Sequence, residues 1–149
     1  MNKITSGAAV AAALALTLIA AGCASLLGGG NRGMPACNAS VCNLVVTVSH
    51  CSISVDNPTL HVGGGTHNPN VRINWMVRSA DPGSAVSFGA DGIFFKPPTN
   101  GQFTNVGGSG AVYSATDLNS MGGTYQYGIN VTQGGTACPT LDPIVINDM

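Results

Sequence analysis

The chain has very little charge. Lysine, arginine, aspartate and glutamate together make up 7% of its 149 residues, and glutamate does not occur at all. Soluble domains usually carry roughly 25% of these residues. The formal net charge of -1 provides no basic field that would attract nucleic acid. We therefore expect no nucleic-acid partner.

The sequence also lacks the common patterns of catalysis. There is no Gly-x-Ser-x-Gly elbow before a helix and no phosphate-binding loop. Each of the six aspartates stands beside a turn-forming residue or near the chain end, where aspartate usually caps its own backbone. We therefore expect no catalytic residue, no cofactor and no enzymatic activity.

No hydrophobic run is long enough for a transmembrane helix. The longest, Ala8–Ala21, follows the basic start Met1–Lys3. It is shorter than the roughly 20 residues that span a bilayer, and it fits the apolar region of a secretory signal peptide. It leads into Ile-Ala-Ala-Gly-Cys, which ends at Cys23.

This stretch resembles the signal of bacterial lipoproteins. The resemblance implies that residues 1–22 are removed and that Cys23 carries lipid, which would anchor the protein in the membrane. Ala24, in place of aspartate, implies the outer membrane of the cell envelope. The alternative is an ordinary signal peptide cleaved near Ala20–Gly22. Residues 23–40 contain Gly28-Gly29-Gly30 and predict a flexible tether, and residues 41–149 predict one β-sandwich domain.

Five cysteines leave an even number once Cys23 is set apart. In an exported chain, four cysteines are expected to pair, and three connectivities are possible. We expect Cys37–Cys42 as a local loop and Cys51–Cys138 as a long-range link. The Cys37-x4-Cys42 spacing has no matching second pair, which disfavours a metal knuckle.

Glycine is abundant, with 21 residues, and polar positions are mostly hydroxyls and amides. This composition suits an all-β protein. The clearest strand is Asn70–Val77, in which Val71, Ile73, Trp75 and Val77 alternate with polar residues. We expect this strand to be central and Trp75, the only tryptophan, to anchor the core.

Turn residues divide the rest of the chain into short strands. Leu44–Val55 predicts one strand with a bulge near His50, where the alternation slips. Ala85–Phe88 and Ile93–Lys96 predict a hairpin closed by Asp91-Gly92. Thr116–Ser120 predicts a helical turn. The other expected strands include Leu60–Val62, Phe103–Val106, Ala111–Ser114, Tyr125–Val131 and Leu141–Asn147, and the Gly107–Gly110 segment predicts a hairpin loop.

About eight short strands at this spacing indicate a sandwich. The stretch Asp117 to Tyr127, with Gly-Thr-Tyr-Gln-Tyr at its end, resembles immunoglobulin-like and cupredoxin-like domains. The resemblance implies a Greek-key sandwich in which the Tyr125 hydroxyl bonds to upstream backbone. Tyr127 stands where immunoglobulins have a cysteine. A cupredoxin copper site needs a histidine after Cys138, and the chain has none after His67.

The remaining candidates for chemistry are three histidines and three phenylalanines. A glycine-rich loop separates His61 from His67, and His50 would point away from Cys51 in the predicted strand. We therefore expect all three histidines to be surface or capping residues and expect no metal site. The phenylalanines, Phe94, Phe95 and Phe103, either pack in the core, as we expect, or form an apolar patch for a partner.

Together these patterns predict a non-catalytic, lipid-anchored protein of the cell envelope with a structural, binding or accessory role. Its partners would be the membrane, through Cys23, and a protein of the envelope. The alternative is a periplasmic copper-handling protein that kept the cupredoxin shape and moved its ligands.

Overall fold

The computed structural model describes Cys37, residues 39–63 and residues 68–148. The expected signal peptide, Cys23, most of the tether and His67 lie outside these residues. Within the described part there is no helix long and apolar enough to cross a membrane.

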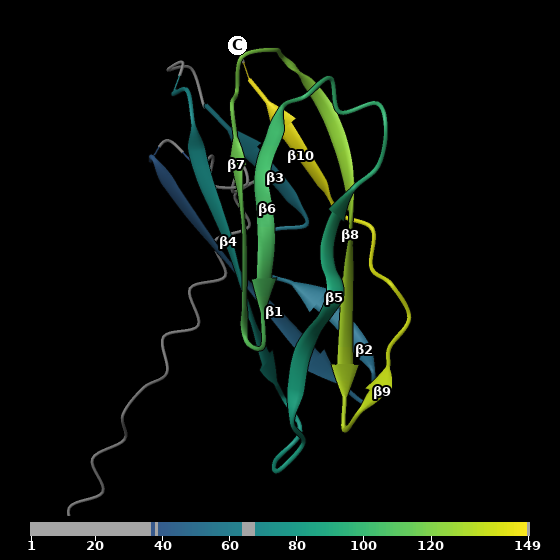
Figure 1. Ribbon diagram of the computed structural model, residues 1–149. Coiled ribbons are helices and arrows are strands. Elements are labelled where there is room, and N and C mark those ends of the chain that lie inside the picture. The colour runs from purple at the N-terminus through teal and green to yellow at the C-terminus, as the bar shows by residue number, and fades with distance from the viewer. Residues whose placement is uncertain (1–36, 38, 64–67, 149) are drawn as a thin grey trace, which may run out of the picture. The chain divides into compact units, whose positions relative to one another are not determined.

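The described residues form two mixed β-sheets that pack as a sandwich (Figure 1), which confirms the all-β prediction. The first sheet has the order β2-β1-β4-β7-β6, and the second has the order β3-β10-β8-β5, with β9 added to β8. Two pairings are parallel, β1 with β4 and β3 with β10. The strands are β1 (Val41–Ser49), β2 (Ser52–Val55), β3 (Thr59–Val62), β4 (Val71–Ser79), β5 (Val86–Phe95), β6 (Phe103–Ser109), β7 (Val112–Asp117), β8 (Gly123–Gln133), β9 (Thr136–Ala137) and β10 (Ile144–Asn147).

Strand β4 lies in the middle of the first sheet, between β1 and β7. Its buried residues alternate with outward ones as the sequence predicts. Trp75 has no exposed surface. Its indole N–H donates a hydrogen bond of 3.2 Å to the Tyr127 hydroxyl of β8, in the second sheet. The two ring centroids are 5.5 Å apart, so this pair of side chains joins the two sheets through the core.

The prediction of one strand over Leu44–Val55 is wrong. The chain reverses at His50 and Cys51, and β1 and β2 pair antiparallel with Ser49 opposite Ser52. Both turn residues have positive φ, 48° and 60°, as the two central residues of a type I′ hairpin turn require. The slip in alternation therefore marks a tight turn instead of a bulge.

The predicted hairpin between Ala85 and Lys96 is also wrong. The segment is one strand, β5, whose register against β8 shifts between Phe88 and Ile93. The residues between them form a bulge in this long strand. Gly92 faces Tyr113 so closely that a Cβ atom would approach the ring to 2.8 Å. The close packing against Tyr113, and not a turn, therefore explains why residue 92 is a glycine.

Two smaller predictions differ from the structure after β5. The expected helical turn at Thr116–Ser120 is absent, because Thr116 and Asp117 complete strand β7. The loop expected at Gly107–Gly110 is shorter, because Gly107, Gly108 and Ser109 belong to β6. At Gly108 a Cβ atom would overlap the backbone of β7, so this glycine permits the close approach of the two strands.

We predict that Trp75→Ala destabilises the fold by about 3 to 5 kcal/mol, the usual cost of removing a large buried ring. The substitution also leaves the Tyr127 hydroxyl without its partner. Denaturant unfolding followed by far-ultraviolet circular dichroism would measure the loss.

The matched control is Met76→Ala, because Met76 is the next residue and is 41% exposed. We expect it to change stability by less than about 0.5 kcal/mol. An equal effect of the two substitutions would contradict the role given to Trp75.

Candidate functional site

The structure joins the four described cysteines as Cys37–Cys42 and Cys51–Cys138, the pairing that the sequence analysis expects. Cys51 lies in the β1–β2 turn of the first sheet, and Cys138 follows β9 of the second. The second disulfide therefore links the two sheets across a sequence separation of 87 residues. Disulfides of this kind indicate an extracytoplasmic domain.

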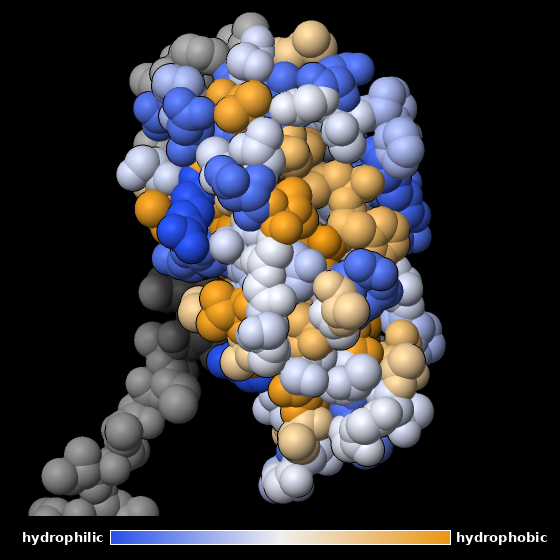
Figure 2. All heavy atoms as spheres, in the orientation of Figure 1, coloured by the Kyte–Doolittle hydropathy of each residue, from blue (hydrophilic) through white to orange (hydrophobic). Residues whose placement is uncertain are grey.

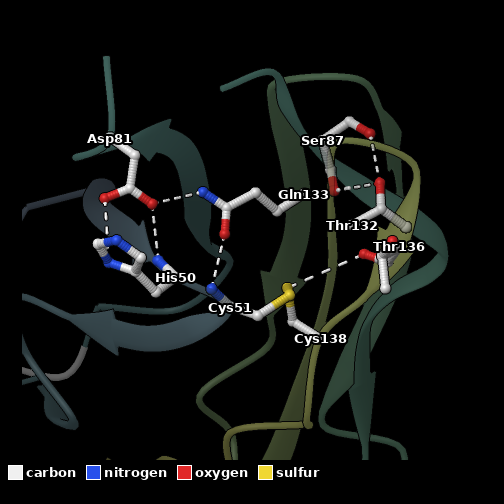
Figure 3. Close-up of a disulfide and its surroundings, with 8 residues drawn as sticks. All are labelled: His50, Cys51, Asp81, Ser87, Thr132, Gln133, Thr136 and Cys138. Atoms are coloured by element: carbon white, nitrogen blue, oxygen red, sulfur yellow. Dashed lines mark hydrogen bonds and ion pairs between the residues drawn. A yellow bond between two sulfur atoms is a disulfide. The ribbon is translucent and has the colours of Figure 1, made fainter. Parts of the chain in front are cut away.

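A carboxylate holds the turn that carries Cys51 (Figure 3). Asp81 accepts hydrogen bonds from the His50 backbone N–H at 2.7 Å, the Gln133 side-chain amide at 2.8 Å and the Ser49 hydroxyl at 2.9 Å. The hydrogen bond from His50, followed by that from Gln133, lowers the pKa of Asp81. The Gln133 carbonyl in turn accepts the Cys51 N–H at 2.6 Å. Asp81 and Gln133 thus satisfy the backbone of both positive-φ residues beside the disulfide.

Each of the two described histidines contacts one aspartate. His50 is exposed and its Nδ1 lies 3.5 Å from Asp81, while His61 Nδ1 lies 2.9 Å from Asp148. No three His, Cys, Asp or Glu side chains gather as metal ligands within the described residues. Cys138 is bonded to Cys51 and so offers no thiolate. These residues do not fit a blue-copper centre.

A buried polar cluster occupies the other end of strand β4. Asp117, the last residue of β7, pairs with Val71 at the start of β4, whereas Asp81 follows the end of β4. Asp117 and Asn119 have no exposed surface, and Asn147 of β10 has 3%. Burial raises the pKa of Asp117. Asp117 caps its own backbone as predicted, because its Oδ1 accepts the Asn119 N–H, but the complete burial of its side chain was not predicted from the sequence.

Gln102 fixes the loop that follows this cluster. Its side chain is 2% exposed, and its carbonyl accepts the backbone N–H groups of Ser120 and Met121 at 2.9 and 3.2 Å. The Met121 carbonyl accepts the Tyr125 hydroxyl at 3.2 Å. The tyrosine therefore bonds to backbone four residues upstream, as the resemblance in sequence implies.

The outward face of β1, β4 and β7, hereafter the outer face, is uncharged except for two arginines. Arg72 and Arg78 are both exposed on β4. Their hydrogen-bond partners among the described residues are neutral: Arg72 bonds to the Asn74 and Ser114 side chains, and Arg78 bonds to Thr47. Along β4 these arginines lie six residues apart, about 20 Å at the usual strand rise. The other outward residues of these strands are Val41, Asn43, Val45, Thr47, Ser49, Asn74, Met76, Val112, Ser114 and Thr116.

The expectation that the phenylalanines pack in the core holds for two of them. Phe95 and Phe103 stack with ring centroids 3.6 Å apart and pack against the core cluster while half-buried. Phe94 lies over Gly128, where a Cβ atom would overlap its ring. Apolar atoms gather on the surface near β5, β6 and β8 (Figure 2), and Val106 of β6 is 40% exposed.

No protein-family model matches this sequence, and no curated protein is significantly similar to it. The candidate site is therefore described from the residues of this chain alone. The buried cluster was not predicted from the sequence, although one pattern indicates it. Tyr113, Ala115 and Asp117 alternate at period two, which places Asp117 on the same buried face as the other two.

We predict that the two disulfides differ in their contribution to stability. The loss of loop-closure entropy in the unfolded chain predicts that Cys51–Cys138 stabilises the fold by about 4.5 kcal/mol and that Cys37–Cys42 does so by about 2 kcal/mol. The double variants C51A/C138A and C37A/C42A, compared by denaturant unfolding, measure the two losses. A smaller loss for the Cys51 and Cys138 pair would contradict the assignment of the main cross-link to this bond.

Proposed function

We propose that this protein is a non-catalytic, lipid-anchored module of the bacterial cell envelope that binds a protein partner. The lipoprotein-like sequence that ends at Cys23 supports the anchor. The disulfides Cys37–Cys42 and Cys51–Cys138 support an oxidising compartment. The proposed location is the outer membrane, because Ala24 follows the lipidated cysteine.

We also propose that the sandwich belongs to the immunoglobulin-like and cupredoxin-like group of Greek-key domains. The bond from the Tyr125 hydroxyl to the Met121 carbonyl supports this assignment, because it matches a tyrosine corner. In immunoglobulins the core tryptophan packs on a disulfide. Here Trp75 packs on Tyr127 instead, which replaces the cysteine.

The proposal that this protein binds a partner rests on the two arginines of the outer face. Arg72 and Arg78 hold two of the three Lys or Arg charges in the described residues, and both bond only to neutral side chains there. The third, Lys96, is paired with Asp142 at 2.8 Å. A guanidinium keeps its charge and offers a planar set of donors to a carboxylate. The outer face is therefore complementary to a partner surface that carries carboxylates.

The copper-handling alternative gains no support from the described residues. Cys138 is committed to a disulfide, and His61 pairs with Asp148. The ligands that a cupredoxin-like site needs are not brought together in this part of the chain.

We predict that cells producing the full chain incorporate radiolabelled palmitate and that Cys23→Ser abolishes the label. Lipid attaches to the cysteine at the end of such a signal, so no other residue can replace it. Cys37→Ser is the control and should keep the label. Label that persists in Cys23→Ser would refute the anchor.

We predict that R72Q/R78Q reduces capture of a crosslinked envelope protein by about tenfold or more. Charge pairs across an interface typically contribute enough for such a loss. Cells carrying the tagged full chain are treated with a crosslinker, and captured proteins are quantified by mass spectrometry.

The matched control is Lys96→Gln, which removes one cation from the other sheet. Its capture should equal that of the unmodified chain. Equal capture by R72Q/R78Q would contradict the assignment of the outer face, and capture that requires Lys96 would move the contact to the second sheet.

A further inference from the structure

Three side chains from both sheets meet between the layers at one end of the sandwich. Asp117 ends β7 of the first sheet, Asn119 follows it by two residues, and Asn147 ends β10 of the second sheet. Figure 1 shows β7 and β10 ending at the same end of the domain. The Asp117 Oδ1 atom accepts the Asn119 backbone N–H at 2.9 Å and the Asn147 side-chain amide at 3.1 Å.

The same three side chains each hold a buried oxygen atom with no hydrogen-bond partner. These atoms are Asp117 Oδ2, Asn119 Oδ1 and Asn147 Oδ1. The side-chain nitrogens are used, since Asn147 donates to Asp117 and Asn119 donates to the Asn68 carbonyl at 3.1 Å. All three unpaired atoms are therefore acceptors, and the cluster has a deficit of donors or of positive charge. Burying such groups without compensation is costly.

No cationic side chain of the described residues compensates the Asp117 carboxylate. Lys96, His61 and His50 pair with other aspartates. Arg72 and Arg78 project from the outer face of β4 and bond to neutral groups. A single buried water would donate to two of the three oxygens and would leave the carboxylate charge without a counterion. A cation held between the three oxygens would satisfy them and the charge together.

We propose that Asp117 Oδ2, Asn119 Oδ1 and Asn147 Oδ1 bind a hard divalent cation of the calcium type. The donor set consists of oxygen alone, which favours calcium over metals that prefer nitrogen or sulfur. One carboxylate and two amide carbonyls make a weakly charged site, and water would supply the rest of the six to eight oxygen ligands that calcium takes. Such sites belong to the affinity range of extracellular modules, with dissociation constants of about 10⁻⁴ to 10⁻³ M. The cation would tie β7 to β10 and so hold the two sheets together at this end.

The test uses the full chain purified in detergent and freed of metal with a chelator. We expect equilibrium dialysis to show one calcium ion per chain, and magnesium at the same concentration to bind more weakly. At a calcium concentration about tenfold above the dissociation constant, the melting temperature should rise by about 5 °C. A melting temperature unchanged up to about 10 mM calcium would overturn the proposal and would indicate a protonated or hydrated carboxyl.

Three variants sharpen the result. Asp117→Asn keeps the shape of the side chain and should abolish the calcium-dependent rise. Asp148→Asn should retain the rise, because Asp148 is a half-buried aspartate that follows Asn147 and pairs with His61 instead. Asn147→Asp gives an expectation of opposite sign. Without calcium, this substitution should lower the melting temperature, because two carboxylates then lie close together. Its dissociation constant for calcium should be about tenfold lower than that of the unmodified chain, because the site gains a negative charge. If Asp117→Asn fails to fold, the unmodified chain and Asn147→Asp still decide the question, and an Asn147→Asp chain indifferent to calcium overturns the site.

Discussion

The hydrogen bond between the Trp75 indole and the Tyr127 hydroxyl is the contact on which the sandwich depends. Both side chains have no exposed surface, and at 3.2 Å each satisfies the buried polar group of the other. Burial raises the pKa of Tyr127 to about 12, so its hydroxyl stays protonated. The bond forms only when β4 and β8 face each other at these two positions. One pair therefore fixes how the two sheets are placed over each other.

Much of this arrangement could be predicted from the sequence, because two strands carry an unbroken alternation. In β4 the buried positions include Ile73 and Trp75, and in β8 they include Tyr125 and Tyr127. A period of two predicts which side chains of a strand face inward, whichever strands it pairs with. The disulfide pairing followed from the even number of cysteines that remain once Cys23 is set apart and from the short spacing of one pair.

The errors fall where distant residues determine the local backbone. The turn at His50 and Cys51 contains no glycine, and nothing nearby in sequence favours its positive φ values. It is held by Asp81 and Gln133, at sequence separations of 31 and 82 residues. Likewise, Asp117 caps the Asn119 backbone as a turn residue does, but its place on the same face as the buried Tyr113 and Ala115 puts the carboxylate inside the sandwich. Such features depend on tertiary contacts that propensity alone does not contain.

The disulfide between Cys37 and Cys42 has a mechanical consequence. Cys37 is bridged to β3, through hydrogen bonds with His61 and Gly63, and is covalently joined to Cys42 in β1. A pull on the preceding segment therefore enters β1 directly and bypasses the intervening backbone. Because β1 lies between β2 and the parallel strand β4, both neighbouring strands share this load. Reduction of the disulfide would remove the covalent shortcut, and the same pull would then reach β1 only through the backbone that follows Cys37.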